Sequence, residues 1–107
     1  MDAFELSEVI AARQRGGDPY LQFLNAGSLS VGLYVLPAGG KDGQRPHAED
    51  EVYYVVAGRA TLLVGDENRP VAPGSLVFVG RDVPHRFHAI AKELTLLVFF
   101  APEHAQG

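Results

Sequence analysis

The chain has 107 residues, of which 47% are hydrophobic and 21% are charged, and its formal net charge at pH 7 is -4. This length suits one domain with a hydrophobic core but is too short for two. An acidic chain without a run of Lys or Arg is not expected to bind nucleic acid, because such binding needs a basic surface. The lack of cysteine excludes disulfides, thiolate metal ligands and thiol nucleophiles.

The two ends of the chain give no targeting or membrane signal. Residues 1–5 lack the basic region and apolar run of a signal peptide. The longest apolar run, residues 94–101, is far shorter than a membrane-spanning helix. We therefore expect a cytoplasmic protein without a membrane partner.

One helix is predicted, at residues 6–15, where apolar side chains recur at helical spacing. Ser7 is a candidate N-cap, and Gly16 and Gly17 end the helix. The rest of the chain shows short runs rich in Val, Leu, Tyr and Phe, separated by Gly, Pro, Asp and Asn, a pattern typical of strands and turns. These strands are predicted at residues 21–25, 28–36, 51–56, 60–64, 69–72, 76–79, 85–90 and 94–100.

Two turns have specific sequence signatures. Residues 65–68, Gly-Asp-Glu-Asn, are predicted to form a hairpin loop. Residues 72–75, Ala-Pro-Gly-Ser, fit a type II turn, with Gly74 where a positive φ is required. Many short strands at regular spacing favour a closed barrel or a sandwich, because closure removes exposed sheet edges. The predicted fold is a single all-β domain with a short helical or irregular N-terminal arm.

The most informative side chains are two histidines and a glutamate. His47 and Glu51 are four residues apart, so on an extended strand both would point to the same face. His85 follows a turn-like segment at residues 80–84 and could contribute a third ligand from a neighbouring strand. Two imidazoles and a carboxylate suit a divalent transition metal, and their facial arrangement suits non-haem Fe(II).

The alternation of residues 45–56 predicts which face is internal. The odd positions begin with polar groups and end apolar, as expected for the mouth of a cavity that leads into a core. They are Arg45, His47, Glu49, Glu51, Tyr53 and Val55. In the next segment the same argument places His85, Phe87 and Ala89 inward and His88 outward.

The even face of the same segment is also apolar, with Val52, Tyr54 and Val56. A strand with apolar side chains on both faces is usually packed against other parts of the protein on both faces. Either the N-terminal arm or a second subunit would supply that cover, and we predict a homodimer.

These residues carry a family resemblance, since the chain resembles a small single-domain cupin over most of its length. The first cupin motif is G-x5-H-x-H-x3,4-E-x6-G, and Gly39, Arg45, His47, Glu51 and Gly58 keep its spacing. The resemblance implies an RmlC-like double-stranded β-helix, the cupin or jelly-roll barrel, with a metal inside. One cupin domain would span residues 1–107, with the barrel core at about 29–100 and the arm at 1–20.

The second motif, G-x5-P-x-G-x2-H-x3-N, is matched less completely. Gly74 and His85 are in register with it. Gly80, Asp82 and Ala89 stand where Pro, Gly and Asn are usual. Both motifs nevertheless occur in the right order, which supports the resemblance.

Arg45 is the main departure, because it occupies the position of the first motif histidine and a guanidinium cannot ligate a cation. Three interpretations follow. His47, Glu51 and His85 could bind the metal alone, or Glu49 or Gln44 could add a fourth ligand. Alternatively the metal has been lost and Arg45 pairs with Glu49 or Glu51. We favour the metal-bound interpretations, because the three other ligands persist in register.

The resemblance implies a metal-dependent enzyme that acts on a small anionic molecule inside the barrel, of oxygenase, isomerase or lyase type. The metal would be Fe, Mn, Ni or Zn. Arg45 could anchor a carboxylate and Phe87 could contact the substrate, while Glu49 or Tyr53 could move a proton. The alternative is a binding or sensor barrel without turnover, because fold alone does not assign function. A barrel without any ligand is least favoured, since ionisable groups on an inward face are costly to desolvate.

Overall fold

The computed structural model describes residues 1–43 and 47–102 of the chain. Within these ranges one helix precedes six strands. They are α1 (Leu6–Gly16), β1 (Tyr20–Asn25), β2 (Ser30–Leu36), β3 (Asp50–Val64), β4 (Glu67–Val71), β5 (Leu76–Val79) and β6 (His85–Ala101). The all-β class predicted from the sequence is confirmed. No helix in the described part of the chain is long and apolar enough to span a membrane.

Helix α1 forms where helical spacing predicted it. Its N-cap is Glu5, which makes no side-chain capping hydrogen bond, so the expectation that Ser7 is the cap is wrong. Ser7 instead lies inside the first turn, because the helix already begins at Leu6. Gly17 ends the helix in the left-handed conformation, with φ of 84°, and its N–H donates to Arg13 O.

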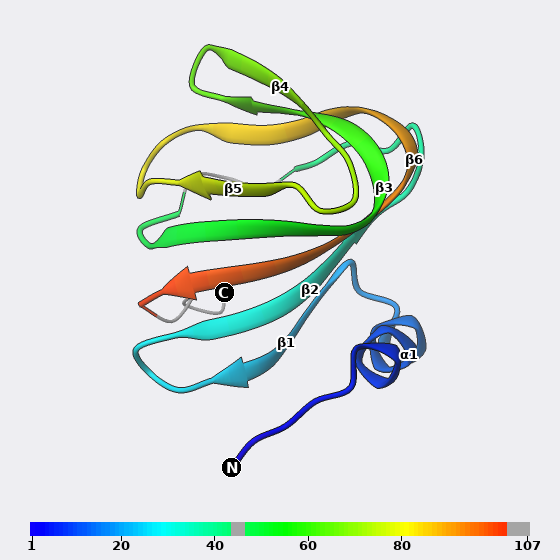
Figure 1. Cartoon of the computed structure of the whole chain (residues 1–107), viewed down its shortest axis with the longest axis vertical. Helices are drawn as coiled ribbons and strands as arrows, with labels where there is room; N and C mark the ends of the chain where they lie inside the picture. The colour runs from blue at the N-terminus through cyan, green and yellow to red at the C-terminus, as the bar shows by residue number, and fades with distance from the viewer. Residues whose placement is uncertain (44–46, 103–107) are drawn as a thin grey trace.

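The strands form one antiparallel sheet with the order β1-β2-β6-β3-β4, and β5 pairs with the N-terminal part of β3, residues 51–54. The four segments predicted at 51–56, 60–64, 85–90 and 94–100 merge into two long strands, β3 and β6. These pair along their whole length, from Asp50 opposite Ala101 to Val64 opposite His85. Register shifts between Val55 and Thr61 mark bulges, which let both strands bend. In Figure 1 the sheet curls on itself, as the predicted barrel requires.

The bulges also reverse which residues face the interior. On β3 the buried residues before the bulge have odd numbers: Glu51, Tyr53 and Val55. Beyond the bulge the buried residues have even numbers: Ala60 and Leu62. The predicted inward face of residues 51–55 is therefore confirmed, although the alternation does not continue past it.

The same reversal corrects one prediction on β6. His85 and Phe87 are buried as expected, but Ala89 is exposed and has a φ of +50°. Ile90 is buried instead. A left-handed residue interrupts the pleat, so simple alternation from His85 could not place Ala89.

The turns between β3 and β5 are tight. Val64 pairs with Glu67, so the hairpin turn contains only residues 65 and 66, two fewer than predicted. The predicted type II turn is confirmed, because Gly74 has a φ of +94° and Ser75 N donates to Ala72 O at 2.9 Å.

The main core fills the barrel. Its buried members are Leu36, Tyr53, Val55, Ala60, Leu62, Val71, Val79, Phe87, Ile90, Leu94, Leu96, Val98 and Phe100. A second, smaller cluster joins Val9 of α1 to Leu33 and Val35 of β2. Figure 1 shows α1 outside the barrel, beside β1 and β2. The N-terminal arm thus covers the outer face of these two strands.

The outer face of β3 remains partly exposed at Val52, Tyr54 and Val56. Across the ladder, Val52 pairs with Phe78 and Tyr54 with Leu76. These two β5 side chains are 63% and 68% exposed. Helix α1 packs on β1 and β2 and not on this region. The apolar surface over β3 and β5 is therefore left exposed.

Candidate metal site

His85 begins β6 and is held by hydrogen bonds on both ring nitrogens. Its Nδ1 lies 2.8 Å from the carbonyl oxygen of Val83, so Nδ1 carries the proton and donates it. Nε2 faces the Tyr53 hydroxyl at 3.1 Å and the Glu51 carboxylate. A histidine whose Nδ1–H is bound to a carbonyl has its Nε2 oriented as a ligand, the usual arrangement around protein-bound metals.

Glu51 lies near the start of β3 and is only 2% exposed. Its Oε1 is 2.7 Å from Nε2 of His85. Its Oε2 is also buried and has no hydrogen-bond partner among the residues that the structure describes. A carboxylate oxygen buried in this way needs a proton donor or a cation.

The proximity of Glu51 controls the protonation of His85. Burial lowers the pKa of His85, but hydrogen bonds to Glu51 and to the Val83 carbonyl outweigh it, together with the negative charges of Glu51 and Asp42. The pKa of His85 is therefore raised above its ordinary value. Without a cation, the pair is stabilised as imidazolium and carboxylate.

His47 reaches the group from the segment before β3 rather than from a strand. Residues 48 and 49 form a bend and β3 begins only at Asp50, so the prediction that His47 and Glu51 share an extended strand is wrong. Hydrogen bonds place this segment: Asp82 N donates to His47 O at 2.7 Å, and Arg81 N donates to Asp50 Oδ1 at 2.9 Å. The His47 segment is thereby joined to the loop that leads into β6.

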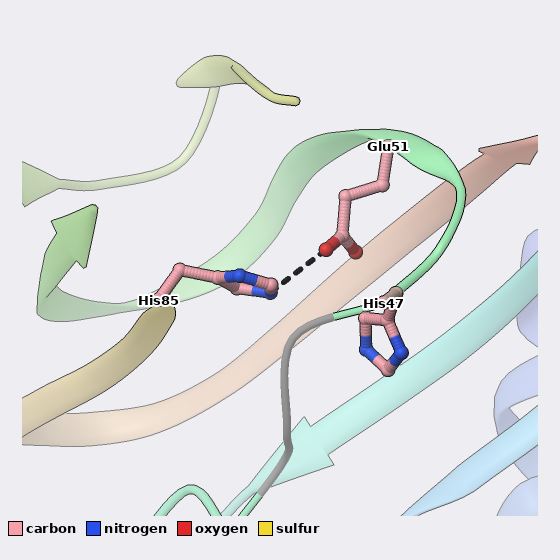
Figure 2. A group of neighbouring side chains, drawn as sticks. All are labelled: His47, Glu51 and His85. Atoms are coloured by element: carbon pink, nitrogen blue, oxygen red, sulfur yellow. Dashed lines mark ion pairs between the residues drawn. The ribbon is translucent and has the colours of Figure 1, made fainter. Parts of the chain in front are cut away.

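The three side chains lie together: Figure 2 shows Glu51 and His85 pointing toward each other, with the His47 ring beside the pair. His47, Glu51 and His85 each offer one ligand atom within 4.8 Å of the others. Ligand atoms on a tetrahedral metal with bonds of about 2.1 Å are about 3.4 Å apart. The 2.7 Å between His85 Nε2 and Glu51 Oε1 is the length of a direct hydrogen bond, so a bound metal would replace that contact. The half-buried ring of His47 lies 5.7 Å from that of His85 between centroids. These residues could hold a metal ion.

The other predicted residues fall into three groups. Tyr53 is buried and joins the site through its hydroxyl, while Glu49 is 8% exposed in the bend before β3. Phe87 is 1% exposed and packs edge-on against Tyr53, at 4.9 Å between centroids. We therefore assign Phe87 to the core rather than to substrate contact. Gln44 and Arg45 lie outside the described residues.

A cavity of about 490 Å³ opens beside the metal group. It is lined by Asp18, Pro19, Tyr20, Tyr34, Leu36, Lys41, Gly43, His47, Val98 and Phe100. His47 thus belongs both to the cavity wall and to the metal group. Its ring also meets Phe100 edge-on, with the centroids 5.1 Å apart.

Sequence reasoning missed the tyrosines of this wall and the residue that fixes one of them. Tyr34 donates to Asp42 Oδ1 at 2.7 Å, and Asp42 Oδ2 accepts from Phe87 N at 2.9 Å. Burial, together with Asp42, raises the pKa of Tyr34. Asp42 therefore links β2 to β6 two residues from His85. Its role had no signal in the sequence, because an isolated Asp in a glycine-rich segment looks like any loop residue.

Comparisons with known proteins agree with this architecture. The uncharacterized protein SCO3923 of Streptomyces coelicolor is 52% identical over 102 residues, covering 95% of this chain and 97% of the relative. The structure of TT1209 from Thermus thermophilus superimposes with a TM-score of 0.74 at 28% identity, covering 95% and 98% of the two chains. KdgF from Halomonas sp. superimposes with a TM-score of 0.73 at 19% identity, covering 79% and 78%, and shares the fold.

The family model for the cupin domain matches residues 32–101, which include the whole candidate metal group. That match covers well over half of the chain. The chain belongs to the cupin family.

Proposed function

We propose that this cupin binds a divalent transition metal through His47, Glu51 and His85 and holds a small anionic molecule in the adjoining cavity. The observation that carries the proposal is the buried Oε2 of Glu51, which lacks a hydrogen-bond partner among the described residues. A cation bound there would satisfy it. Two neutral imidazoles and one carboxylate suit Fe, Mn, Ni or Zn.

Three protein ligands leave coordination positions open for water or substrate. A metal bound there would act as a Lewis acid toward an oxygen of the substrate. The cavity supplies the remaining requirements for binding: apolar walls from Leu36, Val98 and Phe100, and the exposed cation Lys41 at its edge. This combination favours a molecule with an anionic head and a small apolar body.

We further propose that catalysis, if the bound molecule turns over, uses the Tyr53 hydroxyl or the Glu49 carboxylate for proton transfer. Tyr53 supports this role because its hydroxyl already lies 3.1 Å from Nε2 of His85. Oxygenase, isomerase and lyase reactions all fit such a site. Oxygen uptake by the iron-loaded protein with small carboxylates would separate the first class from the other two.

Metal content tests the binding proposal. Protein purified without a tag should bind close to one equivalent of Zn(II) or Mn(II), measured by mass spectrometry after gel filtration. Glu51→Gln, His47→Ala and His85→Ala should each abolish this stoichiometry. His88→Ala is the matched control, since His88 bonds to Asn68 and lies outside the metal group. Wild-type protein that retains no metal would refute the proposal.

We also propose a homodimer built on the outer face of β3 and β5, in a cytoplasmic protein. The support is the apolar surface formed by Leu76 and Phe78 beside Val52 and Tyr54. Large exposed apolar patches mark interaction surfaces. Light scattering should give twice the chain mass of 11.5 kDa for the wild-type protein. Phe78→Glu should reduce the measured mass to that of a single chain. A monomeric wild-type protein at micromolar concentration would contradict this.

A further inference from the structure

One wall of the cavity comes from a part of the chain that the family match does not include. Tyr20, the first residue of β1, lines the cavity together with His47, although the match begins only at residue 32. The chemistry of the ligand pocket is therefore set in part by a strand outside the matched cupin domain.

A glycine makes room for the Tyr20 side chain. A Cβ built on Gly32 would lie 2.2 Å from both Cζ and the hydroxyl oxygen of Tyr20. Glycine within a strand is destabilising relative to alanine, so its use in buried β2 calls for a packing reason. The Tyr20 ring lies across Gly32, with its hydroxyl end directly over the backbone.

The sheet register relates Gly32 to the metal group. Gly32 pairs with Val98 on β6, and Val98 pairs with Tyr53 on β3. Val98 lines the cavity, and the Tyr53 hydroxyl touches His85. The Tyr20 hydroxyl thus lies on the inner surface of the barrel, in the row of residues that ends at the metal group.

The Tyr20 hydroxyl stays protonated in this position. Burial, and after it the negative charge of Glu51, raises the pKa of Tyr20 to about 12. The neighbouring ring of Tyr34 meets that of Tyr20 edge-on, at 6.2 Å between centroids, and is itself held by Asp42. Tyr20 is therefore a protonated hydroxyl held in the wall of the cavity, where it is a potential hydrogen-bond donor.

We propose that Tyr20 determines ligand specificity, because its hydroxyl donates a hydrogen bond to an oxygen of the carboxylate that binds beside His47, Glu51 and His85. This inference rests on the metal-binding function proposed above. The simpler role, an aromatic ring that covers a strand glycine, would be served equally by phenylalanine. The hydroxyl is what distinguishes the two roles.

The test compares two probe ligands on cobalt-loaded protein. Acetate offers oxygen acceptors for Tyr20, whereas imidazole, once bound to the metal, offers none. Both are titrated against the visible absorption of Co(II) in wild-type protein, Tyr20→Phe and Tyr54→Phe. Tyr54 is the matched control, because it lies on the outer face of β3 and does not line the cavity.

The expected result is that Tyr20→Phe lowers acetate affinity about tenfold, the effect of one lost hydrogen bond to a charged group, and leaves Co(II) and imidazole affinities within about twofold. Tyr54→Phe should match wild type. Gly32→Ala is a second variant, since its methyl group would displace the Tyr20 hydroxyl and should also weaken acetate binding selectively.

Equal acetate affinity in wild type and Tyr20→Phe would overturn the inference while leaving the metal site intact. A parallel loss of acetate and imidazole binding would also overturn it, because it would show a merely structural role. Failure of wild-type protein to bind Co(II) at all would instead refute the proposed function and the inference with it. These three results are distinguishable in one set of titrations.

Discussion

Gly58 is the position where a single added methyl group should be most damaging to the barrel. It lies on β3 in the bulged region, with a φ of +97°. A Cβ there would be 2.1 Å from Glu93 O and 2.7 Å from Leu94 Cα, both backbone atoms of β6. Gly58→Ala must therefore force apart the two strands that carry the core.

The expected loss has two parts. A non-glycine residue in a left-handed conformation costs about 1–3 kcal/mol. The contact with Glu93 must open by about 1 Å to reach the 3.0 Å lower limit of real contacts, and Leu94 is fully buried. Such overpacking costs about 1–3 kcal/mol more. The sum, about 2–6 kcal/mol, is a large share of the stability of about 5–15 kcal/mol that is typical of native proteins.

Gly74→Ala is the matched control, because Gly74 has a φ of +94° but no atom within 4 Å of its Cβ position. Gly74→Ala should therefore lose only the stability that corresponds to the conformational cost of a non-glycine residue at positive φ. Urea unfolding followed by circular dichroism gives both free energies of unfolding. Gly58→Ala should be less stable than Gly74→Ala by at least about 1 kcal/mol, the lower end of the overpacking cost. Losses that agree within the error of the two unfolding curves would refute the close approach of β3 and β6 at this glycine.

Three further outcomes are expected. Asp42→Ala should lower the free energy of unfolding by about 2–3 kcal/mol, because Tyr34 loses its acceptor and Phe87 N its partner; an unchanged urea midpoint would contradict this. Tyr53→Phe should keep the packing on Phe87 and should not weaken Zn(II) binding, measured by competition with a chromophoric chelator, because the Tyr53 hydroxyl contacts Nε2 of His85, the nitrogen that a metal would occupy, whereas the hydrogen bond that orients the ring runs from Nδ1 to Val83 O; weaker Zn(II) binding would contradict this. Saturating Zn(II), at about 100 times its dissociation constant, should stabilise the wild-type protein by about 2.7 kcal/mol; an unchanged melting temperature would argue against native-state metal binding.

The fold was predictable because its signals are local and repeated. Gly74 after Pro73 fixed one turn, and the alternation of Glu51, Tyr53 and Val55 placed the inner face of β3 correctly. Alternation failed at Ala89, where a positive φ shifts the pleat. Nothing in the local sequence announces such a bulge, because the paired strand determines it.

The candidate site was predictable in composition but not in geometry. Motif spacing brought His47, Glu51 and His85 into one group, yet His47 reaches it from an irregular segment before β3. That path depends on a hydrogen bond to the loop at Asp82, a contact distant in sequence. Tyr20 escaped notice for a similar reason, since its place in the cavity depends on the glycine of a neighbouring strand.

The location of a bound metal tests the central claim most directly. Crystals grown with Zn(II) and measured at the zinc absorption edge should show one strong anomalous peak, about 2.0–2.2 Å from a ring nitrogen of His47, a ring nitrogen of His85 and a carboxylate oxygen of Glu51. A peak elsewhere, with the direct contact between His85 and Glu51 intact, would show that this pair is a structural ion pair and would contradict the proposed metal site.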